Sequence, residues 1–240
     1  MLPTQKSEPK TELKDLTTLI YGASKIGKST WCSNAEDALF LSTEPGLKAL
    51  KVFEIPIKTW SDFKEPYLEL RKGDHNFKTI IIDTIDNAYL MCAEHVCKKA
   101  KIEHESDLGY GKAYALINNN FQRFITQLAF LPYGLIMTSH SCEKDFQSRI
   151  GIKTKTIPTL PDKPRKIVTG LVDLILFCET ETKLNKDGKT ISRNVMRTKP
   201  TENYDAGDRT GKLPETIPLD YPEFIKAFEG KDKIVKKENK

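Results

Sequence analysis

The chain has 240 residues, of which 38% are hydrophobic and 30% are charged, and its formal net charge is +5. This size suits one α/β domain with a buried core, and the charge permits nucleic-acid binding without establishing it. No run approaches the roughly 18 apolar residues of a membrane helix, and the polar start lacks a signal-peptide core, so we expect a cytoplasmic protein without a membrane partner.

The predicted elements alternate between strands and helices from the start of the chain. Residues 16–21 form a short β-rich run, and a helix over 28–37 follows it. Strands are predicted at 38–42, 53–57 and 79–83, with a helix over 61–72 before the last of them. Most of 79–83 is β-branched, as expected for a strand that is buried on both faces of a parallel sheet.

The second half continues this alternation and then changes. Helices are predicted at 87–101 and 112–131, and a buried strand at 134–139. Strand character returns at 171–178, where a tight-turn signal at 185–188 lets 192–198 pair back as a hairpin, and a short helix is predicted at 221–229. The pattern indicates a mostly parallel sheet flanked by helices, with a C-terminal β-hairpin. We expect a flexible segment at 1–15, one domain over 16–229 and a disordered tail at 230–240.

A phosphate-binding loop is predicted between the first strand and the first helix. Residues 22–30 match GxxxxGK[ST] in full and lie where that motif must lie. The glycines let backbone N–H groups point inward and hold phosphate oxygens. We expect Lys28 to reach the β- and γ-phosphates of ATP and Ser29 to offer its hydroxyl to Mg²⁺. The predicted loop comprises Gly22, Ala23, Ser24, Lys25, Ile26, Gly27, Lys28, Ser29 and Thr30.

Asp83 is predicted to complete the metal site. A carboxylate at the carboxyl end of a central strand can face Ser29 and bind Mg²⁺ directly or through water. Asp86 is a second metal candidate, and its alternative role is to cap the following helix. A zinc site around Cys92, His95, Cys97 and His104 is conceivable, but free thiols fit the predicted helix and the spacing better.

With these motifs in place, the sequence resembles the RecA-like ATPases and, among them, phage proteins of the Sak-type single-strand-annealing group. The resemblance covers residues 16–228 and rests on the phosphate loop, on 39–46, on 135–140 and on 206–214. It implies that Glu44 polarises the attacking water and that His140 takes the γ-phosphate sensor position, where the family commonly has glutamine. The expected catalytic residues are therefore Lys28, Glu44 and His140.

The resemblance also makes residues 143–166 a mobile DNA-binding loop. Its cations are interleaved with Thr, Ser and Gln and accompany Phe146, which suits contacts with phosphates and bases, while a solvated charged loop is the alternative. The candidate DNA-binding residues are Lys144, Arg149, Lys153, Lys155, Lys163, Arg165 and Lys166. Later basic residues of the family reach the γ-phosphate of a neighbouring subunit, and the candidates here are Arg197, Lys199 and Arg209.

Together these features predict an ATP- and Mg²⁺-dependent phage recombination ATPase that binds single-stranded DNA and promotes annealing or strand pairing. Its expected partners are single-stranded DNA, further copies of itself in a ring or filament, and a single-strand-binding protein. One alternative is a helicase-loader-like ATPase that acts on a protein partner. Another is a small-molecule kinase, although residues 144–166 lack the arginine-rich character of a kinase lid.

Overall fold

The apolar and β-branched runs of the sequence form the strands of a mixed sheet. The computed structural model describes residues 2, 4–8, 10, 12–107, 111–148, 151–184 and 187–230. The strands within these ranges are β1 (Thr17–Gly22), β2 (Ala38–Ser42), β3 (Phe53–Pro56), β4 (Thr79–Asp83), β5 (Gly134–Ser148), β6 (Gly151–Pro158), β7 (Leu174–Leu184), β8 (Thr190–Arg197), β9 (Gly207–Asp208) and β10 (Thr216–Pro218).

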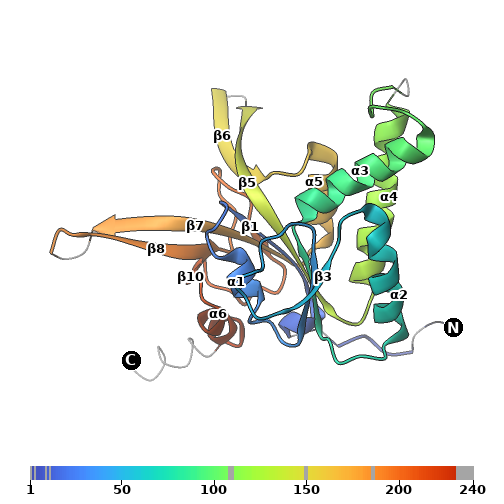
Figure 1. The fold of residues 1–240 in the computed structure, drawn as a ribbon. Helices are drawn as coiled ribbons and strands as arrows, with labels where there is room; N and C mark the ends of the chain where they lie inside the picture. The colour runs from blue at the N-terminus through green and yellow to red at the C-terminus, as the bar shows by residue number, and fades with distance from the viewer. Residues whose placement is uncertain are drawn as a thin grey trace.

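The sheet is parallel at its centre and antiparallel at its margin. Its strand order is β10-β8-β7-β1-β5-β4-β2-β3, with β6 paired to β5 and β9 to β7 (Figure 1). Each neighbouring pair from β7 to β3 is parallel, whereas β8, β10, β6 and β9 pair antiparallel. The predicted fold class, a mostly parallel RecA-like core with a C-terminal β-hairpin, is therefore confirmed.

Helices cover both faces of the sheet. They are η1 (Leu13–Asp15), α1 (Lys28–Cys32), η2 (Trp60–Phe63), α2 (Lys64–Lys72), α3 (Ile85–Ala100), α4 (Lys112–Ala129), α5 (Asp162–Leu171) and α6 (Tyr221–Phe228). One core lies between the sheet and α2 to α5, and a second lies between the sheet, α1 and α6. In α4, Ile117, Phe121 and Ile125 repeat every four residues, so that they share the buried face.

Two hairpins project from the sheet. We call residues 141–148 and 151–158 the β5–β6 arm, and residues 179–184 and 187–194 the β7–β8 arm. Figure 1 shows the β5–β6 arm rising to the top of the view and the β7–β8 arm extending to the left, each as the continuation of a strand. Both therefore start at the sheet and end away from it. No helix in the described ranges is long and apolar enough to cross a membrane.

The expected loop over 143–166 is wrong in its secondary structure. The β5–β6 ladder runs from the pair of Ser141 with Pro158 to that of Ser148 with Gly151, and α5 begins at Asp162. The cause is a period of two without an apolar face: Lys and Thr alternate along 153–156, and a search for buried apolar strands overlooks such a pattern. The described structure does not test the expected mobility.

Two boundaries also differ from the sequence prediction. The first helix ends at Cys32 rather than Asp37, because residues 33–37 turn into β2. The expected flexible segment 1–15 ends in η1, and Leu13 is only 7% exposed because it packs in the second core. The predicted tail at 230–240 lies outside the described residues except for Gly230.

The contact between η1 and β5 generates a stability prediction. A Cβ at Gly134 would lie 2.8 Å from the Cα of Lys14, so we expect Gly134→Ala to lower the free energy of unfolding by about 1–3 kcal/mol. Gly46→Ala is the matched control, because nothing lies within 4 Å of its Cβ position. Urea unfolding of both variants is the measurement, and equal stabilities would contradict the packed position of η1.

Candidate nucleotide site

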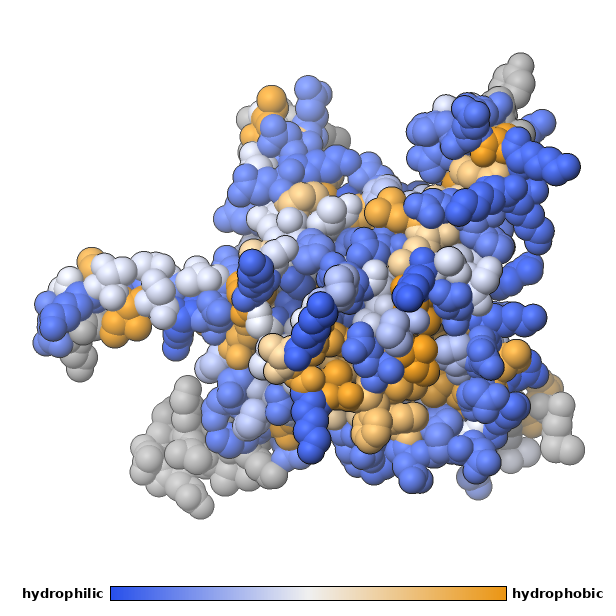
Figure 2. All heavy atoms as spheres, in the orientation of Figure 1, coloured by the Kyte–Doolittle hydropathy of each residue, from blue (hydrophilic) through white to orange (hydrophobic). Residues whose placement is uncertain are grey.

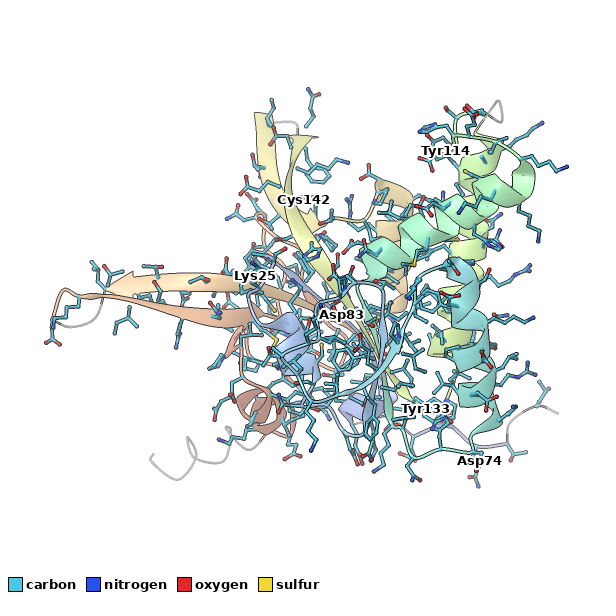
Figure 3. All side chains as sticks on the ribbon, in the orientation of Figure 1. Lys25, Asp74, Asp83, Tyr114, Tyr133 and Cys142 are labelled. Carbon is cyan, nitrogen blue, oxygen red and sulfur yellow. The ribbon has the colours of Figure 1, made fainter. Side chains whose placement is uncertain are left out.

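The carboxyl ends of neighbouring parallel strands converge at one edge of the sheet. Gly22, at the end of β1, pairs with His140 of β5 on one side and with Cys178 of β7 on the other. Asp83, at the end of β4, pairs with Ser42 of β2. Figure 3 shows the labelled Asp83 at this edge and Lys25 near it on the phosphate loop. The edge therefore collects most residues that the sequence singled out.

Two glycines shape the phosphate loop. A Cβ at Gly22 would lie 2.3 Å from the carbonyl oxygen of Cys178, so no larger residue fits against β7. Gly27 has φ 115°, in the left-handed region, immediately before α1 begins at Lys28. These constraints produce the tight curl that lets backbone N–H groups surround a phosphate.

The Lys28 side chain lies inside the loop. Its Nζ donates to the carbonyl oxygens of Gly22 and Ala23, both at 2.9 Å. Burial lowers the pKa of Lys28 by penalising the charged form, while nearby groups, including Asp83, oppose this effect. A cation held in this way is placed to meet the β- and γ-phosphates of a nucleotide.

Ser29 and Asp83 form the predicted metal pair. The Ser29 hydroxyl donates to Asp83 Oδ2 at 2.7 Å, and the Thr138 hydroxyl donates to the other carboxylate oxygen. One hydroxyl, one carboxylate and nucleotide phosphates are the ligand types that Mg²⁺ uses in such sites. The residues present therefore fit the ion. Thr138 was missed by sequence reasoning, although its place two residues before His140 on a buried strand offers a signal.

Glu44 and His140 lie together above the strand ends. The His140 ring is 3.1 Å from Ser24 Oγ through Nδ1 and 3.7 Å from Glu44 Oε1 through Nε2. Both side chains are about one-third exposed, at 34% for His140 and 33% for Glu44. The imidazole therefore touches the phosphate loop on one side and the expected water-positioning carboxylate on the other.

Asp86 has a different role from the two that the sequence suggested. Its Oδ2 accepts the backbone N–H of His140 and its Oδ1 accepts the Ser139 hydroxyl, each at 2.9 Å. Burial raises the pKa of Asp86, and these two hydrogen bonds oppose the shift. Asp86 thus fastens the start of α3 to β5 at Ser139 and His140. In the described hydrogen bonds it neither caps its helix nor contacts Ser29.

The candidate DNA-binding lysines of the arm share one face. Lys144, Lys153 and Lys155 lie with Phe146 on one side of the β5–β6 ladder, because paired residues and alternate residues share a face. Each lysine also contacts a carboxylate: Lys144 that of Asp162 at 2.6 Å, Lys153 that of Glu202 at 2.8 Å and Lys155 that of Asp205 at 2.7 Å. The lysines are therefore gathered but partly neutralised.

The remaining DNA-binding candidates are dispersed. Lys163 and Lys166 are exposed on α5, whereas Arg165 is buried and pairs with Asp162 at 2.9 Å. Arg149 lies outside the described residues. Arg165 and Lys144 thus share one oxygen of Asp162, but Arg165 is buried and does not present its charge on the arm face.

The three trans-acting candidates contact their own chain. Arg197 donates to Glu179 at 2.6 Å, to Glu181 at 3.1 Å and to the Thr216 hydroxyl at 2.7 Å. Lys199 is 3.2 Å from Asp208, and Arg209 donates to the carbonyl of Gly170 at 2.7 Å. This geometry argues against Arg197 as a charge that reaches a neighbouring subunit.

The cysteine cluster gives no metal site in the described part of the chain. No group of three or more His, Cys, Asp or Glu side chains there is arranged to hold a metal ion. Cys92 is buried, and its thiol donates to the carbonyl of Ile117 at 3.7 Å. This buried contact between α3 and α4 gives Cys92 a structural role.

Comparison with known proteins gives a family match over most of the chain. The family model described as "AAA domain" matches residues 14–210. The SPbeta prophage-derived uncharacterized protein YorG of Bacillus subtilis (strain 168) is 24% identical over 194 residues, which cover 77% of this chain and 57% of that protein. This chain therefore spans less than two thirds of that relative.

Two solved structures resemble the fold. The flagellar accessory protein FlaH of Methanocaldococcus jannaschii matches with a TM-score of 0.44 and 13% identity, over 85% of this chain and 84% of that one. An ATPase from the type III secretion system of pathogenic bacteria matches with a TM-score of 0.43 and 13% identity, over 69% and 52%.

The buried carboxylate of Asp86 generates a pH prediction. Because its pKa is raised, its stabilising contribution is full below the unfolded value of about 3.9 and is lost as the pH rises through the raised pKa. Asp86→Asn cannot titrate, so the wild type should lose stability relative to this variant across that window. Urea unfolding of both proteins at several pH values tests this, and a wild type that gains stability relative to Asp86→Asn as the pH rises would contradict it.

Proposed function

The chain belongs to the AAA-domain family of P-loop ATPases, and from this premise we propose that it hydrolyses ATP and couples the nucleotide state to single-stranded DNA through the β5–β6 arm. The prophage-derived relative supports a phage setting. Within that setting, we propose a role in recombination through annealing or strand pairing, as in the Sak-type group. Self-association into a ring or filament is part of the same proposal.

Each catalytic group has a defined task in the proposed hydrolysis. Lys28 and the loop N–H groups hold the phosphates, and Ser29 and Asp83 hold Mg²⁺, which when bound neutralises developing charge on the phosphates. Glu44 lies two residues past the end of β2, the strand next to β4, and accepts a hydrogen bond from the attacking water. His140 lies between Glu44 and Ser24, so it can respond to the γ-phosphate between the attacking water and the phosphate loop.

One observation carries the coupling: β5 exchanges its neighbour at His140. Up to His140 the strand pairs with β1, and from Ser141 onward it pairs with β6. His140, which contacts the phosphate loop, is therefore also the residue that immediately precedes the arm. Asp86 holds the backbone of His140, so a shift of this residue tilts the arm relative to the sheet.

The arm face has the chemistry that a single strand requires. Three lysines can meet phosphates, and Phe146, which is 37% exposed, can stack on a base. Exposed ion pairs contribute only about 0–1 kcal/mol, so DNA phosphates can replace the carboxylates beside these lysines. Figure 2 shows mainly hydrophilic side chains over this arm, with apolar atoms near its end.

A protein partner is the second candidate ligand of the arm. The carboxylate beside each lysine reduces the net charge of the face, and Ile152 at the arm end is 68% exposed. An apolar end beside charge pairs suits a protein surface, as in a helicase-loader-like ATPase. Co-purification with a replicative helicase, without direct DNA binding, would support this alternative over the first.

Nucleotide coupling is tested with Lys28→Ala. Wild-type protein should bind a labelled single strand more tightly with MgATP than without it, and the variant should lose this difference because Lys28 no longer holds the phosphates. Fluorescence anisotropy measures the binding, and magnesium-dependent ATP binding by calorimetry provides the control. A wild-type protein whose DNA affinity is the same with and without MgATP would contradict the coupling.

The arm face is tested with Lys153 and Lys155 both changed to Glu. DNA affinity should fall, and the slope of log affinity against log salt should flatten by roughly 0.7 for each lost phosphate contact. Lys98 and Lys99 changed to Glu form the matched control, because they carry the same charge change on α3, away from the arm. Equal losses in both variants would show that only the net charge matters.

A further inference from the structure

Asn194, at the base of the β7–β8 arm, contacts the phosphate loop from 168 residues away. Its Nδ2 donates to the carbonyl oxygen of Ile26 at 3.0 Å. Its Oδ1 accepts the hydroxyl of Thr180, on the opposing strand, at 2.9 Å. Because the Ile26 carbonyl can only accept, the amide nitrogen must face the loop, and Thr180 holds the amide in that orientation.

This hydrogen bond fixes one peptide plane of the loop. The carbonyl of Ile26 and the N–H of Gly27 belong to the same trans peptide and point in opposite directions. A donor that holds the carbonyl outward therefore keeps the N–H of Gly27 turned the other way. In this motif the loop N–H groups cradle the phosphates from within.

A second contact supports the same side of the loop. The Leu219 backbone N–H donates to the carbonyl of Asn194 at 2.9 Å, and the Leu219 side chain lies 3.5 Å from the position of a Cβ on Gly27. The start of the arm and the segment after β10 thus both contact the outer side of the phosphate loop. Gly27, in its left-handed conformation, would otherwise be free to turn.

We infer that Asn194 is a positioning residue of the phosphate loop, through which the β7–β8 arm sets the affinity for nucleotide phosphates. Asn194 does not contact the reacting atoms, so it acts on binding rather than on the chemical step. The inference rests on nucleotide binding in the proposed function. It adds a second route into the site, on the opposite side of β1 from β5.

The chain offers a closely matched control. Thr182 and Ser192 form the next pair on the same face of the hairpin, two residue pairs further out, and their hydroxyls are 3.0 Å apart. Thr182→Val therefore removes the same kind of cross-strand bond as Thr180→Val, but away from the loop. Figure 2 shows residues of intermediate hydropathy along this arm, as its Thr and Ser side chains require.

The experiment compares binding of MgADP and MgATP by calorimetry with steady-state hydrolysis. For Asn194→Ala we expect both dissociation constants to rise about tenfold, the effect of one lost hydrogen bond, with kcat changed less than about twofold. Thr180→Val should give a smaller rise in the same direction, because the amide loses its orientation but not its donor. Thr182→Val should match the wild type.

The outcomes separate this inference from the proposed function. Equal dissociation constants for Asn194→Ala and Thr182→Val would overturn it, as would a loss of kcat with binding unchanged. If Asn194→Ala fails to fold, Thr180→Val against Thr182→Val still decides the question. A wild-type protein that binds neither nucleotide would instead refute the proposed function.

Discussion

The strand order of the sheet is the constraint on which the site depends. Because β5 lies between β1 and β4, it passes the ends of both strands: Gly22 at the end of β1 pairs with His140, and the ladder with β4 ends where Ile82 pairs with Met137. The parallel direction brings all three ends to the same edge. Thr138 of β5 donates to Asp83, so that β5 contacts the predicted metal pair as well as carrying the proposed sensor, His140.

The same order explains why both arms leave from the nucleotide site. β5 and β7 are the two neighbours of β1, and each continues past the end of β1 into an antiparallel hairpin. Neither continuation belongs to the two hydrophobic cores, so its stability comes from its own ladder, from cross-strand pairs and, in the β5–β6 arm, from ion pairs with Asp162, Glu202 and Asp205. Movable elements are expected where buried apolar contacts are few.

Sequence reasoning located the contiguous motifs and missed the contacts that form between distant segments of the folded chain. The phosphate loop is a contiguous motif between a strand and a helix, and the β-branched run before Asp83 is unambiguous, so both were found. The 143–166 segment has no apolar face, because its strands carry Lys and Thr, and its sequence therefore predicts a loop. The partners of Arg197 and Asn194 could not be inferred, because Glu179, Thr216 and Ile26 reach them only through the folded sheet.

The two arms touch the phosphate loop at different atoms, and this difference matters for what each can control. The β5–β6 arm is joined to it through the preceding residue, His140, whose ring lies beside Ser24 and Glu44, where the terminal phosphate and the water are expected. The β7–β8 arm contacts a backbone atom of the loop: the Asn194 side chain donates to the carbonyl of Ile26, where the loop cradles the inner phosphates. A ligand on the first arm would therefore alter hydrolysis, and one on the second would alter retention of nucleotide in either state.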